Sequence, residues 1–239
     1  SGLTPAFNNN TSWYQPFVIE DSGSAPQVLD SFAAIGDIAL VHERDFVVLG
    51  NSGSGSVTAP VTFVGYAIEE GEDNYTSFDD DTAFTGNIVL MFRYEPLDEH
   101  GASQWSGRRF SPNSNIRDKM DAVIQRGAAG VILVNPPNCR DGRRGLELVR
   151  SSRFGSTVIP VLQLSHDIAE LLISSWSESD LAALQAQADA GTVTTFDMDQ
   201  TATLRTEVET AGVTAQNIGG ILQGTGELAD EWVVIGSHY

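Results

Sequence analysis

The chain has 239 residues, of which 41% are hydrophobic and 23 are glycine, a composition that suits a globular, β-containing protein with a core of its own. Its formal net charge is −19, from 13 basic and 32 acidic residues, which argues against nucleic acid and anionic membranes as partners because the long-range field repels phosphate. No apolar run reaches eighteen residues, and the first residues do not have the charged and apolar regions of a signal peptide, so we expect no membrane insertion.

Apolar runs in the first hundred residues predict three strands. Residues 13–20 read as a short strand in which Pro16 favours an edge position. The Gly/Ser-rich stretch at 50–56 predicts a flexible joint between domains. Residues 62–68 form a second strand, and residues 87–92 are continuously apolar, as in a strand buried on both faces.

A strand–helix–strand unit follows. Ser114 or Asn115 can cap a helix over residues 116–126, which Gly127 ends before an apolar strand at 130–134. The tight spacing is that of a crossover between neighbouring strands.

The rest of the middle region predicts a loop, an apolar strand, two helices and two half-buried strands. Pro160 marks the apolar strand as an edge strand or a bulge. In chain order these elements are the loop at 140–156, the strand at 158–164, helices at 165–173 and 179–188, and strands at 192–196 and 201–208.

The basic residues are concentrated in one window. Eleven of the thirteen lie between Arg93 and Arg153, so that this window carries +4 while the remainder carries −23. Arg108 and Arg109 lie in a loop there, and planar guanidinium groups are suited to bind carboxylates. The alternative is that these arginines pair with acidic residues elsewhere in an acidic protein.

Four blocks in the same middle region carry a resemblance. They are Phe-Val-Gly-Tyr at 63–66, Phe-Thr-Gly-Asn-Ile-Val-Leu at 84–90, the Lys119 helix with the Gly-rich turn into 130–133, and Ile-Pro-Val-Leu-Gln-Leu-Ser at 159–165. In this order they are similar to the protease-associated domain. The resemblance covers about residues 50–198.

The last nine residues carry a second resemblance. An apolar run at 232–235 ends in Gly-Ser-His-Tyr, and a short strand that ends in small residues and a histidine is typical of a metal ligand at the carboxyl edge of a sheet. With the preceding segment 214–224, this run resembles the opening of the catalytic domain in zinc-dependent exopeptidases. That family contains secreted bacterial aminopeptidases and glutamate carboxypeptidases, and in it a protease-associated domain is inserted near the start of the peptidase fold.

The second resemblance implies two zinc ions in the complete enzyme, with a metal-activated water and a glutamate base. Of the metal ligands, only His238 lies in this chain; the base and the other ligands are expected beyond Tyr239. One imidazole cannot hold zinc, so the chain alone is expected to bind none stably, to contain no catalytic residue and to be inactive. His42, His100 and His166 lie in separate segments, and Asp79, Asp80 and Asp81 read as a solvated turn or, alternatively, a calcium-binding loop; Cys139 is a lone cysteine.

The expected fold is mixed α+β, with a β-rich protease-associated domain inserted between strands of an incomplete α/β zinc-peptidase core. The expected domains are residues 1–49, the N-terminal flank of the peptidase core; 50–198, the protease-associated domain; and 199–239, the first strands of the catalytic domain. An inserted domain needs its entry and exit close together, which predicts that residues 13–20 pair antiparallel with 201–209.

The function implied is that of a secreted, periplasmic or cell-surface metallo-exopeptidase of aminopeptidase type that acts on peptides, with the inserted domain shaping substrate access. Arg108 and Arg109 are the candidate substrate-binding residues, and His238 is the candidate metal ligand. A stand-alone protein-interaction module without catalysis is the alternative, and a catalytically dead relative is a third possibility.

Overall fold

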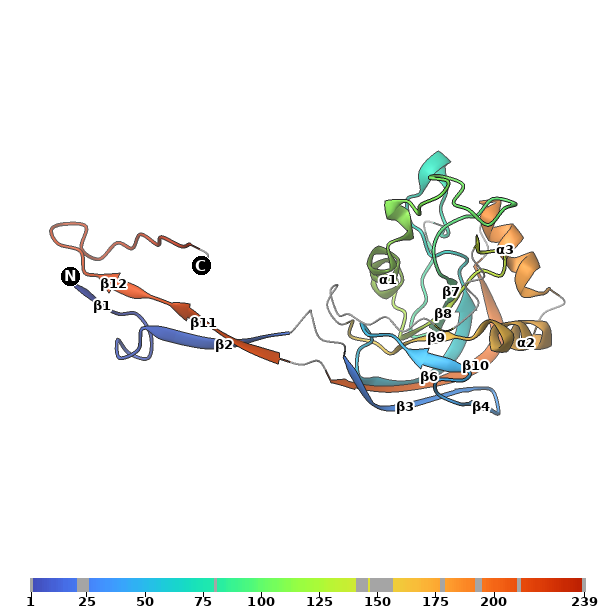
Figure 1. Cartoon of the computed structure of the whole chain (residues 1–239), viewed down its shortest axis with the longest axis horizontal. Helices are drawn as coiled ribbons and strands as arrows, with labels where there is room; N and C mark the ends of the chain where they lie inside the picture. Colours follow the sequence, from blue (N-terminus) through green and yellow to red (C-terminus); the bar gives the residue numbers. More distant parts are fainter. Residues whose placement is uncertain are drawn as a thin grey trace. The chain divides into compact units, whose positions relative to one another are not determined.

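The computed structural model describes residues 2–20, 26–79, 81–140, 146, 157–176, 179–191, 195–209 and 212–237. The chain divides into two compact units, one formed by residues 1–21 with 211–239 and the other by residues 22–210. We call the first the terminal unit and the second the central unit (Figure 1).

The central unit is built on one eight-stranded sheet with the order β4-β3-β10-β6-β7-β8-β9-β5. Its strands are β3 (Gln27–Ile35), β4 (Ile38–Leu40), β5 (Phe46–Val48), β6 (Gly55–Phe63), β7 (Ile88–Phe92), β8 (Gly130–Val134), β9 (Val161–Leu164) and β10 (Phe196–Glu209). Strands β6 to β9 run parallel, and the other neighbours are antiparallel. The helices are α1 (Ile116–Gln125), α2 (His166–Trp176) and α3 (Leu181–Asp189), with 3₁₀ turns at Glu72–Asn74 and Pro112–Ser114. The mixed α+β fold is therefore confirmed.

Side chains of β7 alternate between two hydrophobic clusters. Ile88, Leu90 and Phe92 pack in a cluster that includes α2 and α3, whereas Val89 and Met91 pack in a cluster that includes α1. Figure 1 shows α1 on the opposite side of these strands from α2 and α3. Because successive side chains of a strand point to opposite faces, a strand covered on both sides must be apolar throughout, as predicted for residues 87–92.

The predicted cap of α1 is present, and α3 is capped in the same way. The Asn115 side chain accepts a hydrogen bond from the backbone N–H of Arg117 at 3.1 Å at the start of α1. Asp180 does the same for the N–H of Ala183 at 2.7 Å at the start of α3. In each case a short polar side chain satisfies a backbone donor that has no partner within the helix.

The Gly/Ser-rich stretch at 50–56 is not a flexible joint. Ser52 is buried, and its hydroxyl accepts a hydrogen bond from the N–H of Val161 at 2.9 Å. A Cβ on Gly53 would lie 2.6 Å from the carbonyl oxygen of Thr157, so glycine is needed there for close backbone packing. Small residues in this stretch indicate tight packing, which the sequence alone does not distinguish from flexibility.

The second predicted strand is shifted. Strand β6 begins at Gly55 and ends at Phe63, whereas residues 62–68 were expected. Gly65 and Ala67 both have positive φ, at 59° and 54°, and such a backbone cannot continue a strand.

The predicted pairing of residues 13–20 with 201–209 is wrong. Strand β10 is continuous from residue 196 to 209 and pairs with β3 on one side and β6 on the other. The partner strand β3 was not predicted, because Asp30 and Ser31 interrupt its apolar pattern. Residues 192–194 of the predicted strand at 192–196 lie outside the described residues.

The terminal unit consists of two antiparallel pairs. Strand β2 (Tyr14–Glu20) pairs with β11 (Gly212–Ile218), and β1 (Leu3–Pro5) pairs with β12 (Gly220–Leu222). Residues 232–235, expected to form a strand, have no strand assignment and are between 74% and 92% exposed. None of the residues at 2–19 and 212–237 whose burial the structure describes is buried.

The boundaries between the two compact units fall in the sequence at residues 21/22 and 210/211. The domain boundaries expected from the sequence are at 49/50 and 198/199. The eight-stranded sheet takes strands from all three expected segments, because β3, β4 and β5 precede residue 50 and β10 extends past residue 198.

Candidate anion-binding pocket

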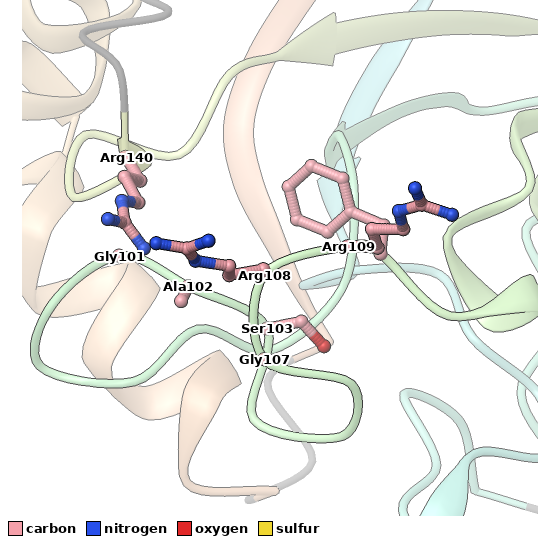
Figure 2. A pocket seen from close by; sticks show the side chains of 8 residues that line it. Gly101, Ala102, Ser103, Gly107, Arg108, Arg109 and Arg140 are labelled. Atoms are coloured by element: carbon pink, nitrogen blue, oxygen red, sulfur yellow. The ribbon is translucent and has the colours of Figure 1, made fainter.

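A pocket of about 240 Å³ in the central unit is lined by three arginines. One wall is formed by residues 101–103 and 107–110, which include Arg108 and Arg109, and the other by Arg140 (Figure 2). The three arginines are exposed, whereas Ser103, which also lines the pocket, is buried.

The pocket lies where two neighbouring parallel strands end. Residues 93–111 follow β7 and residues 135–140 follow β8, and the N–H of Arg93 donates to the carbonyl of Val134 at 2.8 Å where the two strands finish. Loops after parallel strands meet at the carboxyl edge of a sheet, which is where α/β proteins bind ligands. The sheet therefore brings Arg108 and Arg140 together although they are 32 positions apart in the sequence.

Gly101 allows the two loops to touch. Its φ is +70°, and a Cβ there would lie 2.0 Å from the carbonyl oxygen of Asn138 and 2.6 Å from the nitrogen of Arg140. The N–H of Arg140 donates to the carbonyl of Gly101 at 2.9 Å, and the side-chain amide of Asn138 donates to the carbonyl of Asp98 at 3.0 Å. Only glycine fits such an approach, so the position of Arg140 is fixed relative to the other wall.

Glu95 holds the wall that carries Arg108. Its side chain is fully buried, and its carboxylate accepts hydrogen bonds from the hydroxyls of Ser103 and Ser111 and, at 2.7 Å, from the N–H of Ser111. The N–H groups and carbonyls of Ser103 and Gly107 also bond each other in both directions, at 3.1 and 2.9 Å. A buried carboxylate with several donors ties its loop firmly, because an unpaired charge there would be costly.

An aromatic stack and a buried lysine support the same loop. The ring of Phe110, at the pocket, stacks on Tyr94 with centroids 4.4 Å apart and planes 8° apart. Below it, the ammonium of Lys119 donates to the carbonyl oxygens of Phe92, at 2.9 Å, and Tyr94. Burial lowers the pKa of Lys119 well below its ordinary 10.5, and the nearby charge of Arg93 acts in the same direction.

The guanidinium groups of Arg108 and Arg140 are turned toward each other in Figure 2, whereas Arg109 turns the opposite way. Among the ion pairs of the described residues, none includes Arg108, Arg109 or Arg140. Of the three arginines, Arg140 acts on Asp98: the N–H of Ala102 is the main cause that lowers the pKa of Asp98, and the charge of Arg140 contributes in the same direction.

The predicted substrate-binding residues are thus both at the pocket, but they face different ways, and Arg140, which the sequence analysis did not single out, completes it. Its position six residues after the end of the apolar strand β8, next to β7, was the signal available in the sequence. His238 lies outside the described residues, as do Asp80 and most of the predicted loop at 140–156.

Within the part of the chain that the structure describes, no three side chains of His, Cys, Asp or Glu come together as metal ligands would. The helices described here include none with the length and apolar character needed to cross a membrane.

Comparison with solved structures gives partial matches. An aminopeptidase from Aneurinibacillus sp. strain AM-1 is 19% identical, with a TM-score of 0.44 over 85% of this chain and 36% of the other. BSAP, a zinc aminopeptidase from Bacillus subtilis, is 15% identical, with a TM-score of 0.45 over 87% and 36%. The psychrophilic subtilisin-like protease Apa1 from Pseudoalteromonas sp. AS-11 is 12% identical, with a TM-score of 0.37 over 80% and 35%. The chain thus spans about a third of the length of these structures.

No curated protein sequence matches the chain. The family model described as "PA domain" matches residues 55–172, from the first residue of β6 into α2. This range includes all four blocks that resemble the protease-associated domain and all residues that line the arginine pocket. The central unit therefore contains a PA domain, and the pocket belongs to it.

Proposed function

We propose that the chain is the PA-domain-bearing part of a zinc-dependent exopeptidase of aminopeptidase type, in which the central unit shapes the access of peptide substrates. The observation that carries this proposal is the pairing of β2 with β11, in which Glu20 lies opposite Gly212. The chain enters and leaves the central unit through adjacent antiparallel strands of another unit, which is the topology of an inserted domain.

The surface of the terminal unit supports the same proposal. Apolar side chains are exposed on both of its longer strands, among them Phe17 at 40%, Val18 at 70% and Ile218 at 57%. Isolated two-stranded ribbons are marginally stable in water, and exposed apolar strands normally pack against further structure. A peptidase core of which these strands form one part would provide that structure.

Zinc enters the proposal through His238 and the resemblance of residues 214–239 to zinc exopeptidases. Secretion or location at the cell surface is part of the proposal, since the family that the sequence resembles is secreted.

The alternative is a stand-alone interaction module of the PA type. The PA match alone is compatible with it, because a fold does not determine a function. The terminal unit favours the peptidase, because an interaction module has no need of a second pair of strands with exposed apolar side chains.

The test is made on the product of the complete reading frame that contains these residues. We expect it to release the first residue of unblocked peptides, to leave N-acetylated peptides intact, and to lose activity with a chelator and regain it with zinc. His238→Ala is expected to lower kcat/KM by about 100-fold or more, because a ligand of a catalytic metal is lost.

His100→Ala is the matched control, because His100 is also a histidine but its side chain is exposed. Among the ion pairs of the described residues, it takes part in one, with the exposed Glu99. It is expected to leave kcat/KM within about twofold of the wild type. A full-length protein that is folded and zinc-loaded but cleaves no peptide would contradict the proposal and favour the interaction module.

A further inference from the structure

We propose that Arg108 and Arg140 together bind the carboxylate of an acidic peptide side chain. The inference deepens the proposed function, on which its role in substrate selection rests, but the binding itself belongs to the central unit and can be measured without catalysis. Glutamate and aspartate side chains of a peptide are the ligand class.

The first observation is the lack of a close counter-charge. Other arginines of the central unit pair with carboxylates at short distance, such as Arg126 with Glu69 at 2.7 Å and Arg205 with Asp30 at 3.0 Å. No such pair within the described residues includes Arg108 or Arg140, although acidic residues outnumber basic ones 32 to 13 in the chain. Two guanidinium groups turned toward each other repel, and an anion between them relieves that repulsion.

The second observation concerns the nearest acidic group. Asp98 responds to the charge of Arg140, but its Oδ1 atom accepts hydrogen bonds from the N–H groups of His100 and Ala102, both at 2.9 Å. Those bonds hold Asp98 in its own turn as the acceptor of backbone donors. Among the ion pairs of the described residues, Asp98 forms none with Arg108 or Arg140, so the guanidinium donors remain for a ligand in the pocket.

The third observation is that both walls of the pocket are fixed before any ligand binds. Glu95 and its serine partners hold the wall of Arg108, and the contact at Gly101 holds Arg140. A further chain of hydrogen bonds runs from Asn138 N to Gln185 Oε1 at 2.8 Å and from Gln185 Nε2 to Asp189 at 3.0 Å, which ties the Arg140 loop to α3. The backbone positions from which Arg108 and Arg140 project are therefore set, and two planar guanidinium groups suit a planar carboxylate, which can accept from both.

The pocket offers few other groups to a ligand. The Ser103 hydroxyl already donates to Glu95 and accepts from the N–H groups of Trp105 and Ser106. Recognition therefore depends on charge, and a neutral amide of the same shape is a poor substitute. The net charge of −19 does not prevent this, because repulsion is screened beyond about 8 Å at physiological ionic strength.

The experiment titrates the ¹⁵N-labelled chain with N-acetylglutamate α-amide, which carries one side-chain carboxylate and no free terminus. We expect the amide signals of Gly101 and Arg140 to shift with a dissociation constant of about 1 mM at low salt, as for one charged group held by two arginines at the surface. N-acetylglutamine α-amide, its neutral counterpart, is expected to bind at least about tenfold more weakly.

Arg108→Gln and Arg140→Gln are each expected to weaken binding about tenfold, because each removes one charge and keeps most of the side chain. Arg109→Gln is the matched control, since Arg109 lines the same pocket but is turned away from the other two. Equal weakening by Arg109→Gln, or equal binding of the glutamine compound, would overturn the proposal.

Two further probes separate the sources of the anion. N-acetylglycine carries only a terminal carboxylate, and inorganic phosphate carries no carboxylate. If either binds more tightly than N-acetylglutamate α-amide at the same residues, the acidic side chain is not the ligand and the proposal fails.

The complete enzyme separates this inference from the proposed function. There Arg140→Gln is expected to raise KM for substrates with an acidic residue about tenfold while leaving neutral substrates unchanged. Carboxylate binding by a full-length protein without peptidase activity would contradict the peptidase and leave the arginine site standing. If the protein cleaves peptides but its amide signals do not respond to N-acetylglutamate α-amide, the arginine site is contradicted and the peptidase proposal stands.

Discussion

Strand β7 of the central unit and strand β2 of the terminal unit are both rich in apolar residues. Every residue of β7 is paired with a residue of β8, and every residue of β2 is paired with a residue of β11. All five residues of β7 are buried, whereas Val18 of β2 is 70% exposed and Ile19 is 47% exposed. The difference lies in what covers the faces of the strands. Helices α1, α2 and α3 pack on the parallel strands of the central unit, whereas none of residues 2–19 and 212–237 of the terminal unit is buried.

The comparison shows that strand pairing and burial make separate contributions. Seven residues of β2 pair in register with seven of β11, so the backbone hydrogen bonds of the ribbon form without a core. Net stabilisation from such bonds is modest, because they replace bonds to water. The apolar surface removed from water should therefore concentrate the stability in the central unit.

The largest expected effect tests that difference directly. Phe63→Ala should lower the free energy of unfolding of the central unit by about 3–5 kcal/mol, because Phe63 is 1% exposed and lies against Phe92, with ring centroids 5.3 Å apart. Phe17→Ala, the same change at a 40% exposed position of the terminal unit, should change it by less than about 0.5 kcal/mol. Chemical denaturation of both variants makes the measurement, and similar losses would mean that the terminal unit contributes to the same packed core.

A smaller effect is expected at the pocket, where two glycines allow a matched pair. Gly101→Ala should cost about 1–3 kcal/mol beyond the cost of its positive φ and should weaken carboxylate binding, because the new Cβ would lie 2.0 Å from the carbonyl oxygen of Asn138. Gly107→Ala should cost about 1–2 kcal/mol from the positive φ alone, since no heavy atom lies within 4 Å of its Cβ position. Because the two φ angles are +70° and +66°, the difference between the variants measures the close approach of the two pocket loops. Equal binding by both variants would show that this approach does not position Arg140.

The smallest effect is a pH dependence that should arise in the central unit. Burial raises the pKa of Asp189 above its ordinary 3.8, against hydrogen bonds from the N–H of Leu97, the hydroxyl of Tyr66 and the amide of Gln185 that lower it. The folded protein therefore holds this proton more tightly than the unfolded chain. The contribution of this proton to the free energy of unfolding is fully present below about pH 3.8, the pKa of the unfolded chain. It is lost as the pH rises from there through the pKa of the folded state. Between these two pKa values the loss is about 1.4 kcal/mol per pH unit.

Asp189→Asn carries no such proton, so its free energy of unfolding relative to the wild type should increase as the pH rises from about 3.8 into that window. Denaturation of both proteins at several acidic pH values gives the comparison. Parallel curves would show that Asp189 is not responsible.

The elements that could be predicted from the sequence are those with a strong local pattern. The continuous apolar runs gave β7 and β8, and the polar caps gave α1 and α3, because each depends on neighbouring residues only. Strand β3 was missed because Asp30 and Ser31 interrupt its apolar pattern in the more exposed half of the strand. Asp30 is instead held by a salt bridge to Arg205 on the neighbouring strand β10, a contact that the local sequence does not reveal. Pairing partners depend on such distant contacts, which is why β10 was assigned to the wrong sheet.

The same limit applies to the pocket. Arg108 and Arg109 could be selected from the sequence because they lie next to each other in a basic stretch, but their different directions could not. Arg140 reaches the pocket through the parallel alignment of β7 and β8 and the contact at Gly101. Both features depend on residues far away in the chain.

The pairing of Glu20 with Gly212 has a consequence for how the chain could change in evolution. Residues opposite each other in an antiparallel pair have Cα atoms about 5 Å apart, so a turn of two residues could join β2 directly to β11 as an ordinary hairpin. A single in-frame deletion of all but two of the intervening residues would then leave the register of the remaining strands unchanged. The central unit can be gained, lost or exchanged as a whole, while the strands that carry it keep the same pairing.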